Sequence, residues 1–123
     1  MLSSEDTDLL CRVDADTPMG KMMRQYWLPF GYSWEYEKDD QPQRIRLLGE
    51  DLIVWRSSEG ELAVTQPNCP HRGVNFFYGR NEESGIRCAY HGWKFDVTGQ
   101  CVEMPNEPAE SNFKYKVKIK SYR

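Results

Sequence analysis

The chain has 123 residues, the usual size of a single domain with a modest core. Its 16 basic and 19 acidic residues leave a formal charge of −3, so the charge balance gives no reason to expect nucleic acid or a membrane surface as partner. The longest apolar run, residues 52–55, is far too short to span a membrane. The first ten residues, MLSSEDTDLL, are acidic and show no export signal, so we expect a cytoplasmic location by default.

A short helix is predicted over residues 17–28. Thr17 can cap it, Pro18 occupies the first turn, where a missing N–H is tolerated, and Pro29 ends it. Methionine and aromatic side chains along this segment form an apolar face that Gly20 dilutes. Packing of this face against the domain or a neighbouring subunit is favoured over a cofactor surface.

From Gln43 onward the apolar residues alternate with a period of two, which is typical of β-strands. RIRLLG and DLIVWR flank a predicted turn at Gly49-Glu50, and SSEG precedes a further strand, ELAVTQ. IRC is a short strand, and KFDVTGQCVEM is a hairpin that turns at Thr98-Gly99. The last segment, FKYKVKIKSYR, alternates lysine with apolar residues, as a half-exposed edge strand does.

These elements predict a mainly β fold. An N-terminal arm with a short helix, residues 1–40, precedes a small antiparallel β domain, residues 41–123. Two loops of this domain contain the cysteine and histidine motifs that are described next.

Both histidines of the chain lie beside cysteines. CPHRG places Cys69 near His71, and CAYHGWKFD places Cys88 near His91. Two thiolates and two imidazoles can bind one zinc ion, but common zinc modules hold both cysteines in one knuckle and both histidines on a later helix. A [2Fe–2S] cluster of the Rieske type explains mixed pairs better, because each loop then gives one ligand to each of two inequivalent irons. Neutral imidazoles in place of thiolates raise the reduction potential to roughly −150 to +300 mV, against about −400 mV for plant-type clusters.

Residues next to these four are expected to shape the loops. Gly73 and Gly92 allow backbone N–H groups to turn toward the sulfides. Tyr90 and Trp93 can shield the histidine-bound iron, and Arg72 is the remaining neighbour of the ligands.

Two further cysteines, Cys11 and Cys101, lie outside the pattern. Four cysteines can form two disulfides, but in a reducing compartment metal or cluster ligation is the better interpretation. Cys11 and Cys101 are then ordinary thiols.

The two motifs resemble the Rieske domain of aromatic-ring-hydroxylating oxygenases. TPMGKMMRQYWLPF, RIRLLGEDLIVWR and MPNEPAESNFKYKVK resemble the phthalate dioxygenase type of oxygenase component, and the likeness runs from about Asp6 to the last residue. The resemblance implies that Cys69 and Cys88 bind one iron of the cluster and that His71 and His91 bind the other.

The α subunits of that family are several times longer and carry a mononuclear non-haem iron, held by two histidines and a carboxylate. This sequence has no third histidine. The resemblance therefore implies the front piece of an oxidoreductase of aromatic catabolism, a fragment or truncated gene product whose Rieske domain is incomplete at its C-terminal end. The mononuclear Fe(II) and all catalytic residues would belong to a missing C-terminal domain.

The resemblance also implies partners. A flavin and iron–sulfur reductase would deliver electrons to the cluster, which would relay them to the mononuclear iron, with a homotrimer as the possible assembly. A free-standing Rieske ferredoxin and a structural zinc module are the alternatives.

Overall fold

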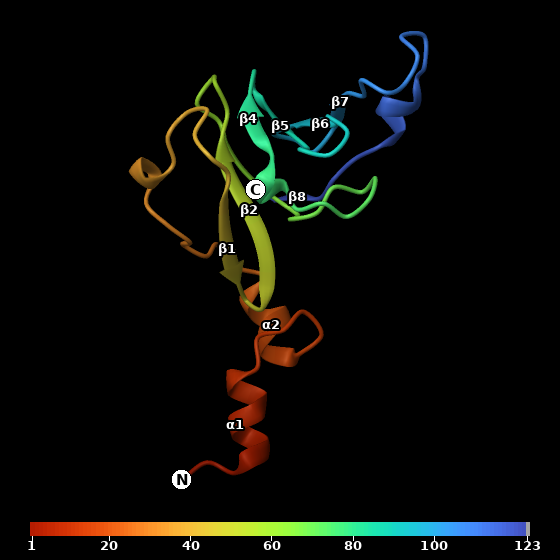
Figure 1. Cartoon of the computed structure of the whole chain (residues 1–123). Helices are drawn as coiled ribbons and strands as arrows, with labels where there is room; N and C mark the ends of the chain where they lie inside the picture. The colour runs from red at the N-terminus through yellow and green to blue at the C-terminus, as the bar shows by residue number, and fades with distance from the viewer. Residues whose placement is uncertain (123) are drawn as a thin grey trace.

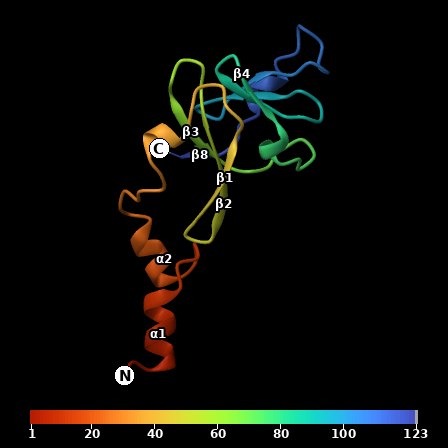
Figure 2. The ribbon, with the colours of Figure 1, turned by 60° about the vertical axis from the view of Figure 1, so that its left-hand side comes forward.

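The structure, a computed structural model, describes residues 1–122. Two four-stranded antiparallel sheets form the body, and two short α-helices form an N-terminal arm (Figure 1). In Figure 2, turned by 60°, the arm again extends from one end of the body. No helix within residues 1–122 is long and apolar enough to cross a membrane. The predicted mainly β fold with a helical arm is confirmed.

The first helix of the arm, α1 (Ser4–Cys11), was not predicted. Ser3 caps it by accepting a hydrogen bond from the Asp6 N–H at 3.0 Å, and Glu5 and Asp6 lie in the first turn, where acidic residues favour the helix dipole. The pattern of serine followed three residues later by aspartate was therefore a usable signal. None of its residues is buried.

The second helix, α2 (Pro18–Met23), starts where the sequence predicts and ends earlier. Thr17 caps it, accepting from the Gly20 N–H at 3.1 Å. The prediction that it continues to residue 28 was wrong. The Arg24 N–H still donates four residues back, to the Gly20 carbonyl at 3.2 Å, but those of Gln25 and Tyr26 donate only three residues back, at 3.1 and 3.2 Å. The chain therefore leaves the α-helical pattern after this point.

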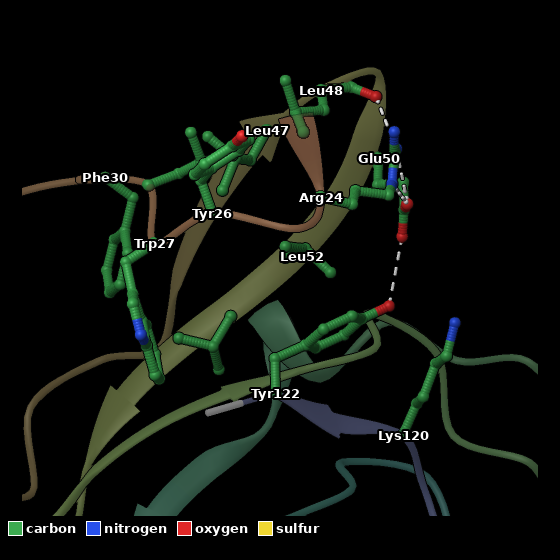
Figure 3. A pocket seen from close by; sticks show the side chains of 12 residues that line it. Arg24, Tyr26, Trp27, Phe30, Leu47, Leu48, Glu50, Leu52, Lys120 and Tyr122 are labelled. Carbon is green, nitrogen blue, oxygen red and sulfur yellow. Dashed lines mark hydrogen bonds and ion pairs between the residues drawn. The ribbon is translucent and has the colours of Figure 1, made fainter. Parts of the chain in front are cut away.

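Arg24 also fastens the arm to the body. Its Nη2 donates to the Leu48 carbonyl at 2.9 Å and to the Glu50 carboxylate at 2.7 Å, and Glu50 accepts from the Tyr122 hydroxyl at 3.1 Å (Figure 3). The hydrogen bond from Arg24 lowers the pKa of Glu50. A hollow of about 410 Å³ lies beside this contact, with Trp27 and Phe30 of the arm on its wall. Arg24 and Glu50 together thus join the arm, the first hairpin and Tyr122.

The first sheet begins with the predicted hairpin. Leu48 and Gly49 form its turn with φ of 48° and 81°, the two positive values of a tight hairpin turn, so the turn lies one residue earlier than predicted. Glu50 already belongs to the second strand and pairs with Leu47. The strands of this sheet, in spatial order, are β1 (Gln43–Leu47), β2 (Glu50–Arg56), β3 (Leu62–Thr65) and β8 (Ser121–Tyr122).

The second sheet is a simple meander. The predicted IRC strand and the hairpin at Thr98-Gly99 are both present; Gly99 has a φ of 84° and donates to the Asp96 carbonyl at 2.9 Å. The strand that precedes IRC was not predicted. In spatial order the sheet contains β4 (Arg80–Glu82), β5 (Gly85–Arg87), β6 (Lys94–Asp96) and β7 (Cys101–Glu103).

The segment FKYKVKIKSYR is not the continuous edge strand that its alternation predicts. Phe113–Lys116 is a 3₁₀ helix, and only Ser121–Tyr122 pairs as a strand of the first sheet, while Arg123 lies outside the described residues. The segment crosses from one sheet to the other. Ile119 is buried, and its N–H donates to the Gly99 carbonyl at 2.8 Å. The segment therefore packs between the two sheets and does not form one face of a single sheet.

The core contains Trp55, Phe76 and Phe95 as its largest fully buried side chains. The Phe76 and Phe95 rings meet edge to face, with centroids 5.5 Å apart. Cys69 and Cys88 belong to the same buried cluster. The two motif loops therefore grow directly from the packed core. Two further 3₁₀ helices, Ser33–Glu35 and Phe76–Tyr78, complete the chain.

Candidate metal centre

The two motifs fold into two loops with the same backbone closure. In the first loop (residues 69–74) the Cys69 N–H donates to the Val74 carbonyl at 2.9 Å. In the second loop (residues 88–93), which joins β5 to β6, the Cys88 N–H donates to the Trp93 carbonyl at 2.8 Å. Each cysteine thus lies at the root of a closed turn, where its side chain starts in the core.

The glycine of each loop completes this closure. The N–H of Gly73 donates to the Cys69 carbonyl at 2.9 Å, and that of Gly92 donates to the Cys88 carbonyl at 3.1 Å. Both glycines have a φ of +73°, the left-handed region that other residues enter only with strain. The two loops differ in where the histidine falls, two residues after Cys69 and three after Cys88.

The two cysteines form the buried half of the site, with exposed fractions of 2% for Cys69 and 5% for Cys88. Burial, followed by the nearby Cys88, raises the pKa of Cys69 to about 12. Without a cation this thiol keeps its proton at neutral pH, and a metal must displace the proton to gain a thiolate ligand.

The two histidines form the more exposed half. The His71 and His91 rings lie with centroids 4.5 Å apart. Loss of hydration, and then repulsion by His71 and Arg72, lower the pKa of His91. His91 is thus favoured in the neutral form, which is the form of imidazole that binds metal.

The predicted aromatic neighbours each lie against one histidine. The Trp93 ring is stacked on the His71 ring at 4.4 Å with an interplanar angle of 6°. The Tyr90 ring lies 3.8 Å from the His91 ring, tilted by 44°. Trp93 is buried and Tyr90 is exposed, so the ring against His71 is withdrawn from solvent and the ring against His91 is not.

Arg87 supports the second loop and was missed by sequence reasoning. Its Nη1 donates to the Gly92 carbonyl at 2.9 Å, and its other N–H groups bind Glu82 and Glu103. Hydrogen bonds from Arg87 lower the pKa of both carboxyl groups. Its position directly before Cys88, in a predicted strand, was the available signal.

Residues just after β7 also reach the second loop and were missed. Asn106 accepts a hydrogen bond from Trp93 Nε1 at 2.8 Å, and Pro105 lies 3.2 Å from where a Cβ on Gly92 would be. The segment MPNEPAESNFKYKVK carries these residues, but no spacing rule links it to the loops.

The donor set fits a cluster of two inequivalent irons. The four side chains form a buried sulfur pair, Cys69 and Cys88, and a partly exposed imidazole pair, His71 and His91. A Rieske [2Fe–2S] cluster needs such a division, because one iron takes two cysteines and the other takes two histidines.

The remaining cysteines lie outside the two loops. Cys11 is exposed at the end of α1. Cys101 is fully buried in β7, and burial raises the pKa of its thiol to about 11.

The chain has sequence relatives among known proteins. The Rieske [2Fe-2S] domain family matches residues 26–123. The chain is 53% identical over 124 residues to the phthalate 4,5-dioxygenase oxygenase subunit of Pseudomonas putida, a match covering 100% of this chain and 28% of that protein. It is 47% identical over 122 residues to the 3-chlorobenzoate-3,4-dioxygenase oxygenase subunit of Comamonas testosteroni, covering 99% of this chain and 28% of that protein.

Chains in solved structures share this fold. The fold resembles one chain of the reduced complex between oxygenase and ferredoxin in carbazole 1,9a-dioxygenase, with a TM-score of 0.67 and 31% identity, covering 80% of this chain and 25% of that chain. It also resembles dicamba monooxygenase with non-heme iron and dicamba, with a TM-score of 0.68 and 26% identity, covering 80% of this chain and 29% of that chain.

The chain spans 28% of the length of the phthalate and chlorobenzoate relatives that it matches. The matched family, the paired loops and the related oxygenase subunits all agree with the cofactor and the electron-transfer role expected from the sequence. The chain belongs to the Rieske [2Fe-2S] family, as an electron-transfer domain of the phthalate dioxygenase type of oxygenase subunit.

Proposed function

We propose that Cys69 and Cys88 bind one iron of a Rieske [2Fe–2S] cluster and that His71 and His91 bind the other. The observation that carries this assignment is the repeated loop. Two turns with the same backbone hydrogen bonds and a glycine at φ +73° place a buried cysteine at their roots.

The residues divide the work of holding such a cluster. The buried cysteines keep water away from the iron that they bind. The closed loops limit how far the ligands move when the cluster gains or loses an electron. The histidines lie toward solvent, with centroids 4.5 Å apart, and provide a route for an electron to or from a docked protein. When bound, the cluster supplies a one-electron acceptor with a potential of roughly −150 to +300 mV.

We further propose that this domain relays electrons inside a longer oxygenase that acts on an aromatic acid. The names of the related subunits, which include phthalate and 3-chlorobenzoate dioxygenases, support this substrate class. A related oxygenase forms a complex with a ferredoxin, so an electron-donor protein is a property of the family. A flavin and iron–sulfur reductase as donor, and a homotrimer as assembly, are the specific forms proposed here.

The chain divides into two parts. We propose an arm over residues 1–40 and a cluster domain over residues 41–123. Two observations support this division: α1 buries no residue, and β1 begins only at Gln43.

Anaerobic reconstitution with iron and sulfide tests the ligand assignment. We expect a red-brown protein with two irons and two acid-labile sulfides per chain, and a reduced-state electron paramagnetic resonance signal of low average g. The serine variants C69S and C88S should lose this cluster, whereas C101S should keep it. A colourless protein with one zinc per chain would overturn the proposal.

A further inference from the structure

The short segment after β7, residues 104–106, lies on the second loop. Pro105 packs against Gly92, and Asn106 Oδ1 accepts a hydrogen bond from Trp93 Nε1 at 2.8 Å. This segment belongs to neither motif, yet it fixes the residue that closes the second loop.

The Trp93 ring carries this restraint to the first loop. Its indole lies parallel to the His71 imidazole, with centroids 4.4 Å apart and an angle of 6° between the planes. Phe113 meets the same indole edge to face at 6.3 Å and 76°. A side chain from one loop therefore covers a candidate ligand from the other.

The hydrogen bond from Asn106 limits how the indole can turn. Trp93 is only 6% exposed, and a buried indole N–H needs an acceptor because it can only donate. Asn106 is itself exposed, and its Oδ1 is the acceptor of the indole N–H in this structure; without it, the indole is free to rotate toward another acceptor. Such a rotation would end its parallel contact with His71.

We propose that Asn106 is a positioning residue of the cluster site. By accepting the Trp93 Nε1–H, it holds the indole flat against His71 and so fixes the orientation of this imidazole on its iron. The inference rests on the proposed function, because it takes His71 as a cluster ligand. Partners of this kind, one step away from the ligands, set how ligands are oriented in metal sites.

Pulsed electron paramagnetic resonance of the reduced, cluster-loaded protein tests this directly, because ¹⁴N hyperfine couplings report how each imidazole is oriented on its iron. Asn106→Leu removes the acceptor at similar size, and Asn106→Asp keeps an oxygen in its place. Asn112→Leu is the matched control, since Asn112 is exposed and its side chain makes no capping hydrogen bond. We expect N106L to shift the ¹⁴N coupling of one imidazole, and N106D and N112L to keep the wild-type couplings.

Unchanged couplings in N106L, or equal shifts in N106L and N106D, would overturn the proposal. If N106L fails to load a cluster, Trp93→Phe tests the same hydrogen bond from the donor side, and wild-type couplings in W93F would overturn it as well. Loss of the cluster in N106L, N106D and W93F together would mean that the pair serves the fold alone. If the wild-type protein shows no pair of coupled imidazoles, the ligand assignment itself fails.

Discussion

The two loops share a backbone and differ in their surroundings. Around the first loop, Gly73 has open space where a Cβ would point, and Arg72 is exposed. The second loop is held from outside, because Arg87 binds the Gly92 carbonyl and Pro105 packs against Gly92. Two loops with the same backbone hydrogen bonds are therefore stabilised to different extents by their surroundings. Backbone hydrogen bonds close both loops, and side chains from neighbouring segments additionally brace the glycine of the second.

The loops should be equal in ligation despite this difference. His71→Cys and His91→Cys each replace a neutral imidazole with a thiolate on the same iron. In either variant, if it loads a cluster, the midpoint potential should fall by on the order of 200 mV, toward plant-type clusters at about −400 mV. Protein-film voltammetry gives both values. A variant that loads its cluster with an unchanged potential would show that its histidine is not a ligand.

Removing an arginine should affect the second loop far more than the first. Arg87→Met removes a hydrogen-bond partner of Glu82 and of Glu103, which keep only Arg80 and Lys94, and it frees the Gly92 carbonyl. We expect a loss of about 2 kcal/mol in the free energy of unfolding. The matched change on the first loop is Arg72→Met. It removes an exposed side chain and should cost less than about 0.5 kcal/mol.

Urea unfolding of both metal-free variants decides the comparison. Equal losses in R87M and R72M would remove the distinction between a braced and an unbraced loop.

The two glycines offer a smaller and sharper version of the same test. Gly73→Ala and Gly92→Ala both place a Cβ at φ +73°, which costs about 1 kcal/mol. Gly92→Ala should cost more, because Pro105 lies 3.2 Å from the new Cβ whereas nothing lies within 4 Å at Gly73. Thermal unfolding of the two variants gives the order, and a greater loss in G73A would contradict it.

The pH dependence should be the smallest effect. Hydrogen bonds from Arg87 lower the pKa of Glu82 and Glu103 in the folded state. A lowered folded pKa means that this stabilisation is present above the unfolded carboxyl pKa of about 4.3 and is lost as pH falls toward the folded value. Stability measured from pH 6 to pH 3 should fall in the wild type. The fall should be shallower in R87M, and identical slopes would show that these carboxyl groups do not need Arg87.

Features with a local signature could be predicted from the sequence. The spacing of Cys69, His71, Cys88 and His91 predicts paired loops. The Thr17-Pro18 start and the Thr98-Gly99 turn also follow from short-range chemistry. Each of these features depends on residues within one turn or one hairpin, so the residues that cause it are neighbours in the sequence.

Features that depend on distant contacts could not be predicted. Asn106 meets Trp93 only because β6 and β7 bring their ends together. Arg24 at the end of α2 binds Leu48 and Glu50, which lie in a hairpin far along the chain. The alternation of FKYKVKIKSYR indicated a strand because a crossing segment that buries Ile119 shows the same local pattern as a sheet edge.

Mössbauer spectroscopy of the protein reconstituted with ⁵⁷Fe reports the ligands of each iron separately, so it tests how the four ligands are divided between two irons. We expect two iron sites of equal area that differ in isomer shift, one bound by the two cysteines and the other by the two histidines. In H71C or H91C the second site should move toward the first. Two equivalent irons in the wild type, or one mononuclear iron, would contradict it.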